Sequence, residues 1–184
     1  MALSGIRVID LTRILAGPFC TLMLADMGAE VIKVEPPKGD PVRGQGAIKD
    51  GLSWYFSQFN RNKKSIVLDL YTEDGKADLK LLLESADVLV ENYRPGVLAK
   101  MGFTTEFLEE INPRLICASV NGYGSTGPYV DRPSFDFIAQ AMSGFMSVNG
   151  SADSDPMRAA PPMSDMIAGL YTAFGVVTAL HARQ

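Results

Sequence analysis

The stretch Gly5-Ile6-Arg7-Val8-Ile9-Asp10, followed downstream by Gly28-Ala29-Glu30-Val31-Ile32-Lys33-Val34-Glu35, decides the fold. Ile6, Val8 and Ile9 form a short β-branched run typical of a buried parallel strand. Between the two stretches a helix is predicted to open at Gly17-Pro18 and to stop at Gly28, since glycine takes the positive φ that ends a helix. A strand, a helix and a second strand with such short joints predict a right-handed βαβ unit.

The rest of the chain repeats this alternation. Further strands are predicted over residues 65–70, 87–91 and 115–120, and helices over 53–56, 74–85, 105–111, 135–148 and 166–183. On the helix over 74–85, Ala77, Leu81 and Leu82 are expected to face inward. Loops rich in proline, glycine and polar residues are predicted over 36–51, 121–129 and 149–162. The sequence therefore predicts an α/β fold, a Rossmann-like, open and mostly parallel sheet with helices on both faces.

Composition narrows the class of protein. The 184 residues suit one domain, and 47% hydrophobic with 21% charged residues is typical of a globular chain. A net charge of −4 without a long basic run argues against nucleic acid as a partner. No apolar stretch is expected to reach the roughly 18 residues of a membrane helix, so no membrane partner is expected. The predicted strand near the N-terminus leaves no room for a targeting peptide, which favours a cytoplasmic location.

Few side chains are available for nucleophilic or metal chemistry. Cys20 and Cys117 both lie among apolar residues and are expected to be buried, reduced thiols. His181 is the single histidine and lies near the end of the last predicted helix, which argues against a histidine-based triad or a histidine metal site. A nucleophile or base is therefore sought among carboxylates, hydroxyls, lysines and cysteines, and no metal is expected.

The carboxyl ends of the first two strands are a candidate binding edge. Ligands of such sheets bind there, near helix N-termini, which points to residues 12–17. Glu35 ends the second strand where a dinucleotide fold would hold a ribose. The stretch 11–17 has one glycine where the dinucleotide fingerprint needs three, so a strand-terminal glutamate that reaches solvent is the favoured interpretation.

Asp165 is the carboxylate that we single out. Ser164 is expected to cap the last helix and to place Asp165 in its first turn, where the helix dipole and free N–H groups favour the charged form. An acid at this position commonly stabilises a helix, so position alone favours a structural role. Pro161-Pro162 stiffen the approach to the helix, and Ala168 with Gly169 leave space beside the acid.

Seven stretches in order resemble the family III CoA-transferases, the CaiB/BaiF family. They are residues 10–18, 28–35, 60–65, 90–96, 122–129, 135–144 and 164–169. The resemblance covers essentially the whole chain and implies that residues 1–184 form the Rossmann-like, CoA-binding portion of a large domain. Members of the family continue with a small domain and a returning C-terminal segment, both absent from this chain, and two subunits interlock as a homodimer.

The resemblance also implies a reaction. Asp165 would attack an acyl-CoA thioester to give an aspartyl anhydride, and the released CoA thiolate would then give an aspartyl-CoA thioester. A small carboxylic acid would complete the exchange. The substrates implied are thus an acyl-CoA, with coenzyme A as the carried group, and a carboxylic acid, whose identities the sequence leaves open.

Residues for CoA carry over from the matching motifs. They are Leu15, Ala16, Asn62, Lys63, Lys64, Asn92, Tyr93 and Lys100. Pro36 stands where some members have an arginine for a phosphate, and Arg43 or Lys38 would replace that contact. Asp136 would act as a polar orienter near the site or simply as a first-turn helix acid.

Three alternatives remain open from the sequence. The α-methylacyl-CoA racemases share the fold but have a histidine base where this chain has Phe135, which cannot accept a proton. A dinucleotide-dependent oxidoreductase is favoured only by the opening βαβ unit. A non-enzymatic fragment is the third, because residues 180–184 end a helix without a stop signal. For the same reason the chain by itself is expected to have little transferase activity and to expose apolar surface.

Overall fold

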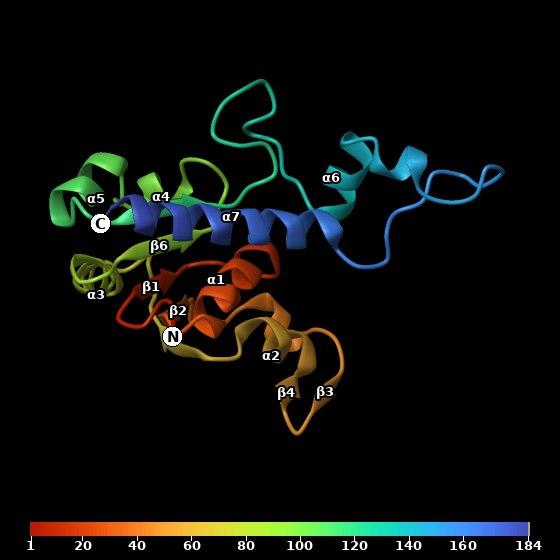
Figure 1. Cartoon of the computed structure of the whole chain (residues 1–184). Coiled ribbons are helices and arrows are strands. Elements are labelled where there is room, and N and C mark those ends of the chain that lie inside the picture. Colours follow the sequence, from red (N-terminus) through yellow and green to blue (C-terminus); the bar gives the residue numbers. More distant parts are fainter. Residues whose placement is uncertain (184) are drawn as a thin grey trace.

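The computed structural model describes residues 1–183 and contains a single five-stranded parallel sheet within them. Its strands are β1 (Arg7–Asp10), β2 (Glu30–Glu35), β5 (Lys63–Val67), β6 (Val88–Glu91) and β7 (Ile116–Ser119). They lie side by side in the order β5-β2-β1-β6-β7, of which Figure 1 labels β2, β1 and β6. The winding therefore reverses between β1 and β6, which makes the carboxyl ends of these two strands the topological switch point.

Helices cover both faces of the sheet, as the sequence predicted. The helices that pack on the sheet are α1 (Ala16–Asp26), α3 (Glu73–Glu84), α5 (Thr105–Ile111) and α7 (Met163–Ala182). The other elements are the helices α2 (Trp54–Asn60), α4 (Val97–Lys100) and α6 (Asp136–Met142), the 3₁₀ turns η1 (Pro41–Gly44) and η2 (Phe145–Val148), and the hairpin β3 (Ile48–Lys49) and β4 (Leu52–Ser53). Figure 1 shows α6, η2 and the loop after them extending away from the sheet.

Two apolar clusters, one on each face, hold the layers together. Neighbouring residues of β1 point to opposite faces, so Val8 packs with α1 and α7 while Ile9 packs with α3 and α5. Both side chains are fully buried. Near-continuous apolar strands of this kind need cover on both faces, which explains why four helices pack on so short a sheet.

Helices α1 and α7 approach so closely that only glycine fits at their contact. A Cβ on Gly169 of α7 would lie 2.5 Å from the carbonyl oxygen of Ala16 and 3.2 Å from the amide nitrogen of Cys20. Beyond this contact α7 contributes the buried Ala173 and Val176 to the core. The contact places the start of α7 beside the loop that follows β1.

Several predicted boundaries are corrected. The helix expected over 135–148 is two pieces, because Gly144 has a φ of +80° and ends α6. The last helix starts at Met163 with Pro162 as its N-cap residue, so Ser164 is not the cap. Lys63 and Lys64, which precede the strand predicted over residues 65–70, are the first two residues of β5.

The inward faces also differ in two places. On α3, Leu79 and Leu83 are buried, while Ala77 and Leu81 are exposed, because the helix rotates its i, i+4 leucine pair onto the sheet. Cys20 is buried as expected, but Cys117 is exposed, since β7 is an edge strand and helices do not cover that position.

By length and composition alone, helix α7 is long and apolar enough to cross a membrane. This corrects the expectation that no apolar stretch reaches the length of a membrane helix. In the fold one of its faces packs on α1 in the core. Its other face exposes Ile167, Leu170, Tyr171 and Phe174, spaced as a single stripe along the helix. The chain thus exposes apolar surface, as expected from its sequence.

The helix contact predicts opposite effects for two alanine substitutions on α7. Gly169→Ala forces its methyl group into the backbone of α1 and should lower the free energy of unfolding by about 1–3 kcal/mol. Gly175→Ala is the matched control, because a Cβ there meets nothing within 4 Å and should raise that free energy by about 0.5–1 kcal/mol. Urea denaturation followed by circular dichroism measures both. Equal effects of the two variants would contradict the close contact.

Candidate active site

A cleft of about 390 Å³ opens at the switch point of the sheet. One wall is the loop after β1, a second is the turn after β6, and the others come from the glycine-rich segment and the starts of α6 and α7. Its polar, aromatic and first-helix lining residues include Arg13, Leu15, Ala16, Asn92, Tyr93, Arg94, Tyr123, Arg132, Phe135 and Asp165. The cleft therefore joins segments from across the whole chain.

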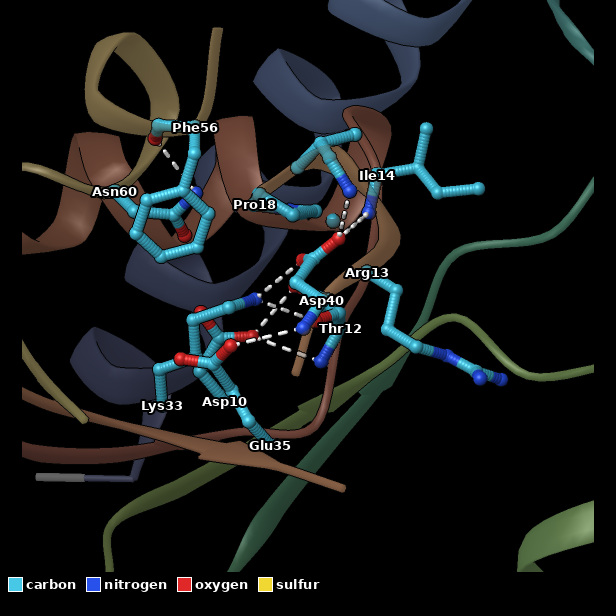
Figure 2. Close-up of polar contacts among 12 residues, drawn as sticks. Asp10, Thr12, Arg13, Ile14, Pro18, Lys33, Glu35, Asp40, Phe56 and Asn60 are labelled. Atoms are coloured by element: carbon cyan, nitrogen blue, oxygen red, sulfur yellow. Dashed lines mark hydrogen bonds and ion pairs between the residues drawn. The ribbon is translucent and has the colours of Figure 1, made fainter. Parts of the chain in front are cut away.

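The loop after β1 rests on a buried polar cluster (Figure 2). Lys33 Nζ donates to the carbonyl oxygen of Thr12 at 2.7 Å and pairs with Asp40 Oδ2 at 3.0 Å. Asp40 Oδ1 accepts from the amide of Ile14 at 3.3 Å. Ile14 has a φ of +70°, a conformation that a β-branched residue avoids. The buried ion pair thus holds the loop in a strained shape directly before Leu15 and Ala16.

A second buried pair supports the same loop from below. Lys63 Nζ contacts Asp10 Oδ2 at 3.1 Å and also donates to the carbonyl oxygen of Pro18 and to Asn60 Oδ1, both at 3.0 Å. Asp10 accepts in addition from the hydroxyls of Thr12 and Thr21. Burial by itself would raise the pKa of Asp10, but Lys63 and Lys33 hold it below its ordinary value.

The turn after β6 clasps the other side of the loop. Asn92 Oδ1 accepts from the amide of Arg13 at 2.8 Å, and Asn92 Nδ2 donates to the Arg13 carbonyl oxygen at 2.7 Å. The Arg13 guanidinium lies 5.0 Å from the ring centre of Tyr93. The side-chain amide of Asn92 therefore orders the wall of the cleft.

Asp165 lies in the first turn of α7 at the cleft, but another carboxylate caps that helix. Asp136 Oδ1 accepts from the amides of Ser164 at 2.8 Å and of Asp165 at 3.4 Å. Asp136 is itself the first residue of α6 and is buried. Because these N–H groups are occupied by Asp136, they do not stabilise a charge on the Asp165 side chain, contrary to the expectation from sequence.

Gln140 completes this arrangement one turn further along α6. Its Nε2 donates to Asp136 Oδ2 at 2.6 Å, and its Oε1 accepts from the amide of Ala159 at 2.8 Å. Gln140 is fully buried. We call Asp136 and Gln140 the α6 clamp, because the pair ties α6, the loop before α7 and the first turn of α7 together.

The clamp and the surroundings make Asp165 an unusually basic carboxylate. Burial and the neighbouring Asp136 raise its pKa to about 6. The pKa of Tyr55 on α2 is raised, first by burial and second by the nearby charge of Asp165. A carboxylate whose pKa lies close to neutral pH, at the edge of a cleft, has the character of a nucleophile or a base.

The structure brings only part of the predicted CoA set to the cleft. Leu15, Ala16, Asn92 and Tyr93 line it together with Asp165. Asn62, Lys63 and Lys64 do not. Asn62 donates to Asp26 Oδ1 and Lys64 pairs with Glu30, both away from the cleft, while the donors of Lys63 are occupied within the buried cluster.

Lys100 does not line the cleft. It lines a second cavity of about 290 Å³, together with Tyr71, Lys76 and Met101.

Glu35 was predicted to reach solvent, and the structure corrects this prediction. Glu35 is buried and accepts two hydrogen bonds from Arg43, at 2.7 and 2.6 Å, so that guanidinium braces the loop after β2. Burial by itself would raise the pKa of Glu35, but the hydrogen bonds from Arg43 and Ser65 outweigh burial and lower that pKa to about 2. Lys38 is exposed on the same loop.

Sequence reasoning included Arg13 only within the candidate stretch 12–17, and it missed Tyr55 and Gln140. The i, i+4 spacing of Asp136 and Gln140 was a usable signal, since it predicts that two side chains meet on one helix face. Nothing in the local sequence around Tyr55 indicates that α2 approaches α7, because that proximity depends on the tertiary fold.

Comparison with known proteins gives a consistent family match. The model of CoA-transferase family III matches residues 3–184. The chain is 47% identical to a succinate–glutarate CoA-transferase of Agrobacterium fabrum over 97% of its length and 46% of that protein. It is also 47% identical to an acetyl-CoA:oxalate CoA-transferase of Acetobacter aceti, over 98% of this chain and 47% of that protein. The chain thus spans about half the length of these relatives.

Solved structures match the fold over the same region. A CaiB/BaiF family protein from Brucella suis superposes with a TM-score of 0.94 at 41% identity, covering 98% of this chain and 49% of that one. A hypothetical protein from Mycobacterium tuberculosis superposes with a TM-score of 0.90 at 38% identity, covering 98% and 51%.

The α6 clamp predicts that the pKa of Asp165 depends on the charge of Asp136. Asp136→Asn should lower that pKa from about 6 toward its ordinary value, because a neutral amide replaces the neighbouring charge. The measurement is carbon-detected NMR titration of labelled aspartate carboxyls. An unchanged pKa in the variant would contradict the assigned cause.

A double variant controls for the hydrogen bonds. In Asp136→Asn alone, the new side-chain NH₂ group would face the NH₂ group of Gln140, so two hydrogen-bond donors would meet without an acceptor. Asp136→Asn combined with Gln140→Glu restores acceptors both for that new amide and for the Ala159 N–H. The double variant moves the charge one helical turn away from Asp165. It should therefore keep the fold while the pKa of Asp165 stays below its wild-type value.

Proposed function

Because the chain belongs to CoA-transferase family III, we propose that the full-length protein moves CoA from an acyl-CoA thioester to a carboxylic acid, with Asp165 as the nucleophile. The observation that carries this proposal is the Asp165 carboxylate, with a pKa raised to about 6, at the cleft of the switch point. The names of the relatives support the reaction class, since those proteins are called CoA-transferases for succinate, glutarate and oxalate.

The exchange proceeds through four acyl transfers that balance without water. Asp165 attacks the thioester carbonyl, the carbon–sulfur bond breaks, and an aspartyl anhydride and the CoA thiolate form. The thiolate attacks the aspartyl carbonyl and releases the first acid, which leaves an aspartyl-CoA thioester. The acceptor carboxylate attacks this thioester to give a second anhydride, and the thiolate then takes the new acyl group. Asp165 ends as the free carboxylate.

The basicity of Asp165 suits this chemistry. A carboxylate with a pKa of about 6 is mostly ionised at pH 7, and it is a stronger nucleophile than an ordinary aspartate. The charge of Asp136 repels the Asp165 carboxylate in the free protein, and this repulsion is relieved once Asp165 is acylated. The α6 clamp thus favours the covalent intermediates over the resting state.

We assign the CoA molecule to two neighbouring features of the fold. Leu15, Ala16 and Tyr93 line the cleft beside Asp165 and would contact the thioester end and the pantetheine arm. Lys76 and Lys100 at the second cavity would contact phosphate groups of the nucleotide. The exposed stripe on α7 supports a homodimer in which further chain or a second subunit covers that face.

Replacing the nucleophile separates its chemical role from a helix-stabilising one. In the full-length protein, Asp165→Asn should lower turnover by at least about a thousandfold, since the attacking oxygen anion is lost. The melting temperature should not fall, because Asp136 rather than Asp165 caps α7. Acyl-CoA followed by hydroxylamine should give the wild-type protein a hydroxamate at Asp165, detected by peptide mass spectrometry.

Asp155→Asn, in the exposed loop before α7, is the control that should leave turnover unchanged. Near-normal activity of Asp165→Asn, or a hydroxamate at a different residue, would refute the assignment.

The racemase alternative makes a different prediction at Phe135. This side chain lines the cleft and is 58% exposed, so its ring occupies a position from which a base could reach a substrate. Since phenylalanine cannot accept a proton, 2-methylacyl-CoA incubated with the full-length protein in deuterated water should keep its α-hydrogen. Mass spectrometry of the recovered ester measures the exchange, and rapid deuteration would favour the isomerase.

A further inference from the structure

Gln140 is a buried polar side chain on α6 to which the proposed reaction assigns no task of its own. Only 1% of it is exposed, and within the described part of the chain it does not line the cleft, although the preceding Ala139 does. Burying a side-chain amide is costly unless its polar atoms find partners. The two partners that Gln140 has both lead to the start of α7.

The hydrogen bonds of Gln140 fix the orientation of its amide. Its Nε2 donates to Asp136 Oδ2 at 2.6 Å, and its Oε1 accepts from the amide of Ala159 at 2.8 Å. A carboxylate can only accept and a main-chain N–H can only donate, so the reverse orientation would satisfy neither neighbour. The position therefore requires one donor and one acceptor at the same reach from α6, and glutamine provides both.

Gln140 also determines where the Asp136 carboxylate points. Asp136 Oδ1 accepts from the amides of Ser164 at 2.8 Å and Asp165 at 3.4 Å, while Gln140 occupies Oδ2. Asp136 is 8% exposed, so without the Gln140 donor its Oδ2 would be a buried charged oxygen that lacks a partner. The carboxylate would then turn toward another partner and release the α7 amides.

The main chain is held at two points on its way into α7. Gln140 binds the amide of Ala159, and the other member of the α6 clamp binds that of Ser164. Pro161-Pro162 lie between these two points, and proline restricts φ, so the connecting segment has little freedom to adapt. A displacement at Gln140 is therefore passed on to the first turn of α7, which carries the candidate nucleophile.

We propose that Gln140 is a positioning residue of the reaction, which acts through Asp136 and Ala159 to hold the Asp165 carboxylate in the geometry required for attack on the thioester. This inference rests on the proposed function, because it assigns a support to the same nucleophile. A misplacement of about 1 Å at a reacting group can lower a rate about a hundredfold. A side chain outside the cleft can thus matter for the reaction without touching the substrate.

Two substitutions separate the hydrogen bonds of Gln140. Gln140→Met keeps an unbranched side chain and removes both bonds. Gln140→Glu keeps the acceptor for Ala159, but it donates to Asp136 only while the introduced carboxyl is protonated. Burial and the neighbouring Asp136 carboxylate raise the pKa of that introduced carboxyl. The donor is therefore present below this pKa and is lost as the pH rises through it.

The expected readout is a change in kcat without a matching change in KM. In the full-length protein, Gln140→Met should lower kcat by at least about tenfold at every pH and leave the KM for acyl-CoA nearly unchanged, because the residue lies outside the cleft. For Gln140→Glu, kcat relative to wild type should be highest near about pH 6.5 and should fall toward the methionine value by about pH 9. Taking the ratio cancels ionisations that both proteins share.

Gln58→Glu on α2 is the matched control, because Gln58 is exposed and lines neither cavity, and its kcat should equal that of the wild type at each pH. Circular dichroism at the assay temperature establishes that each variant is folded. A wild-type kcat in folded Gln140→Met, with the melting temperature as the only change, would show a purely structural role and overturn the inference. A ratio for Gln140→Glu that does not depend on pH would also overturn it, as would a raised KM with an unchanged kcat.

Should Gln140→Met fail to fold, the pH dependence of Gln140→Glu decides. The proposed function fails separately, if the wild-type protein transfers CoA to no acid and gives no hydroxamate at Asp165.

Discussion

Two buried ion pairs beneath the loop after β1 are the constraint on which the cleft depends. Asp10 with Lys63 and Lys33 with Asp40 place four charges where almost no solvent reaches them. Removing one partner would leave an unpaired buried charge and would lower the free energy of unfolding by about 3–5 kcal/mol. The pairs also direct hydrogen bonds to the main chain of Thr12, Ile14 and Pro18, which fix the loop that borders Asp165. Polar groups that cost much to bury are thus used to define backbone shape.

The start of α7 divides two tasks between two carboxylates. Asp136 takes the helix N–H groups and remains hydrogen bonded to Gln140, so it is fully occupied. Burial and the neighbouring charge of Asp136 raise the pKa of Asp165. One acid therefore caps the helix while the other keeps a raised pKa at the cleft, a separation that a single first-turn acid could not provide.

Sequence periodicity predicted the sheet and its helices, because β-branched runs and glycine stops are local signals that the fold does not override. The catalytic role of Asp165 came from the resemblance to a family and stays a prediction. The basic stretch at Asn62, Lys63 and Lys64 could not be interpreted in the same way. Whether a lysine meets a ligand or a buried aspartate depends on strand register, and Lys63 pairs with Asp10, 53 residues earlier in the chain. Likewise, the cap on α7 comes from a residue 28 positions upstream. Long-range polar pairs of this kind leave little trace in a local pattern.

The architecture of the cleft also bears on how this protein can diverge. Its floor, the loop after β1, is tied to buried charges, and any change there disturbs several hydrogen bonds at once. The glycine-rich segment 121–135, which forms another wall, makes few hydrogen bonds to the sheet. Substitutions in that wall can therefore change the lining of the cleft at little cost in stability, whereas substitutions in the loop after β1 break several hydrogen bonds at once. New specificities in such a scaffold should arise by loop replacement, with the core sequence inherited unchanged.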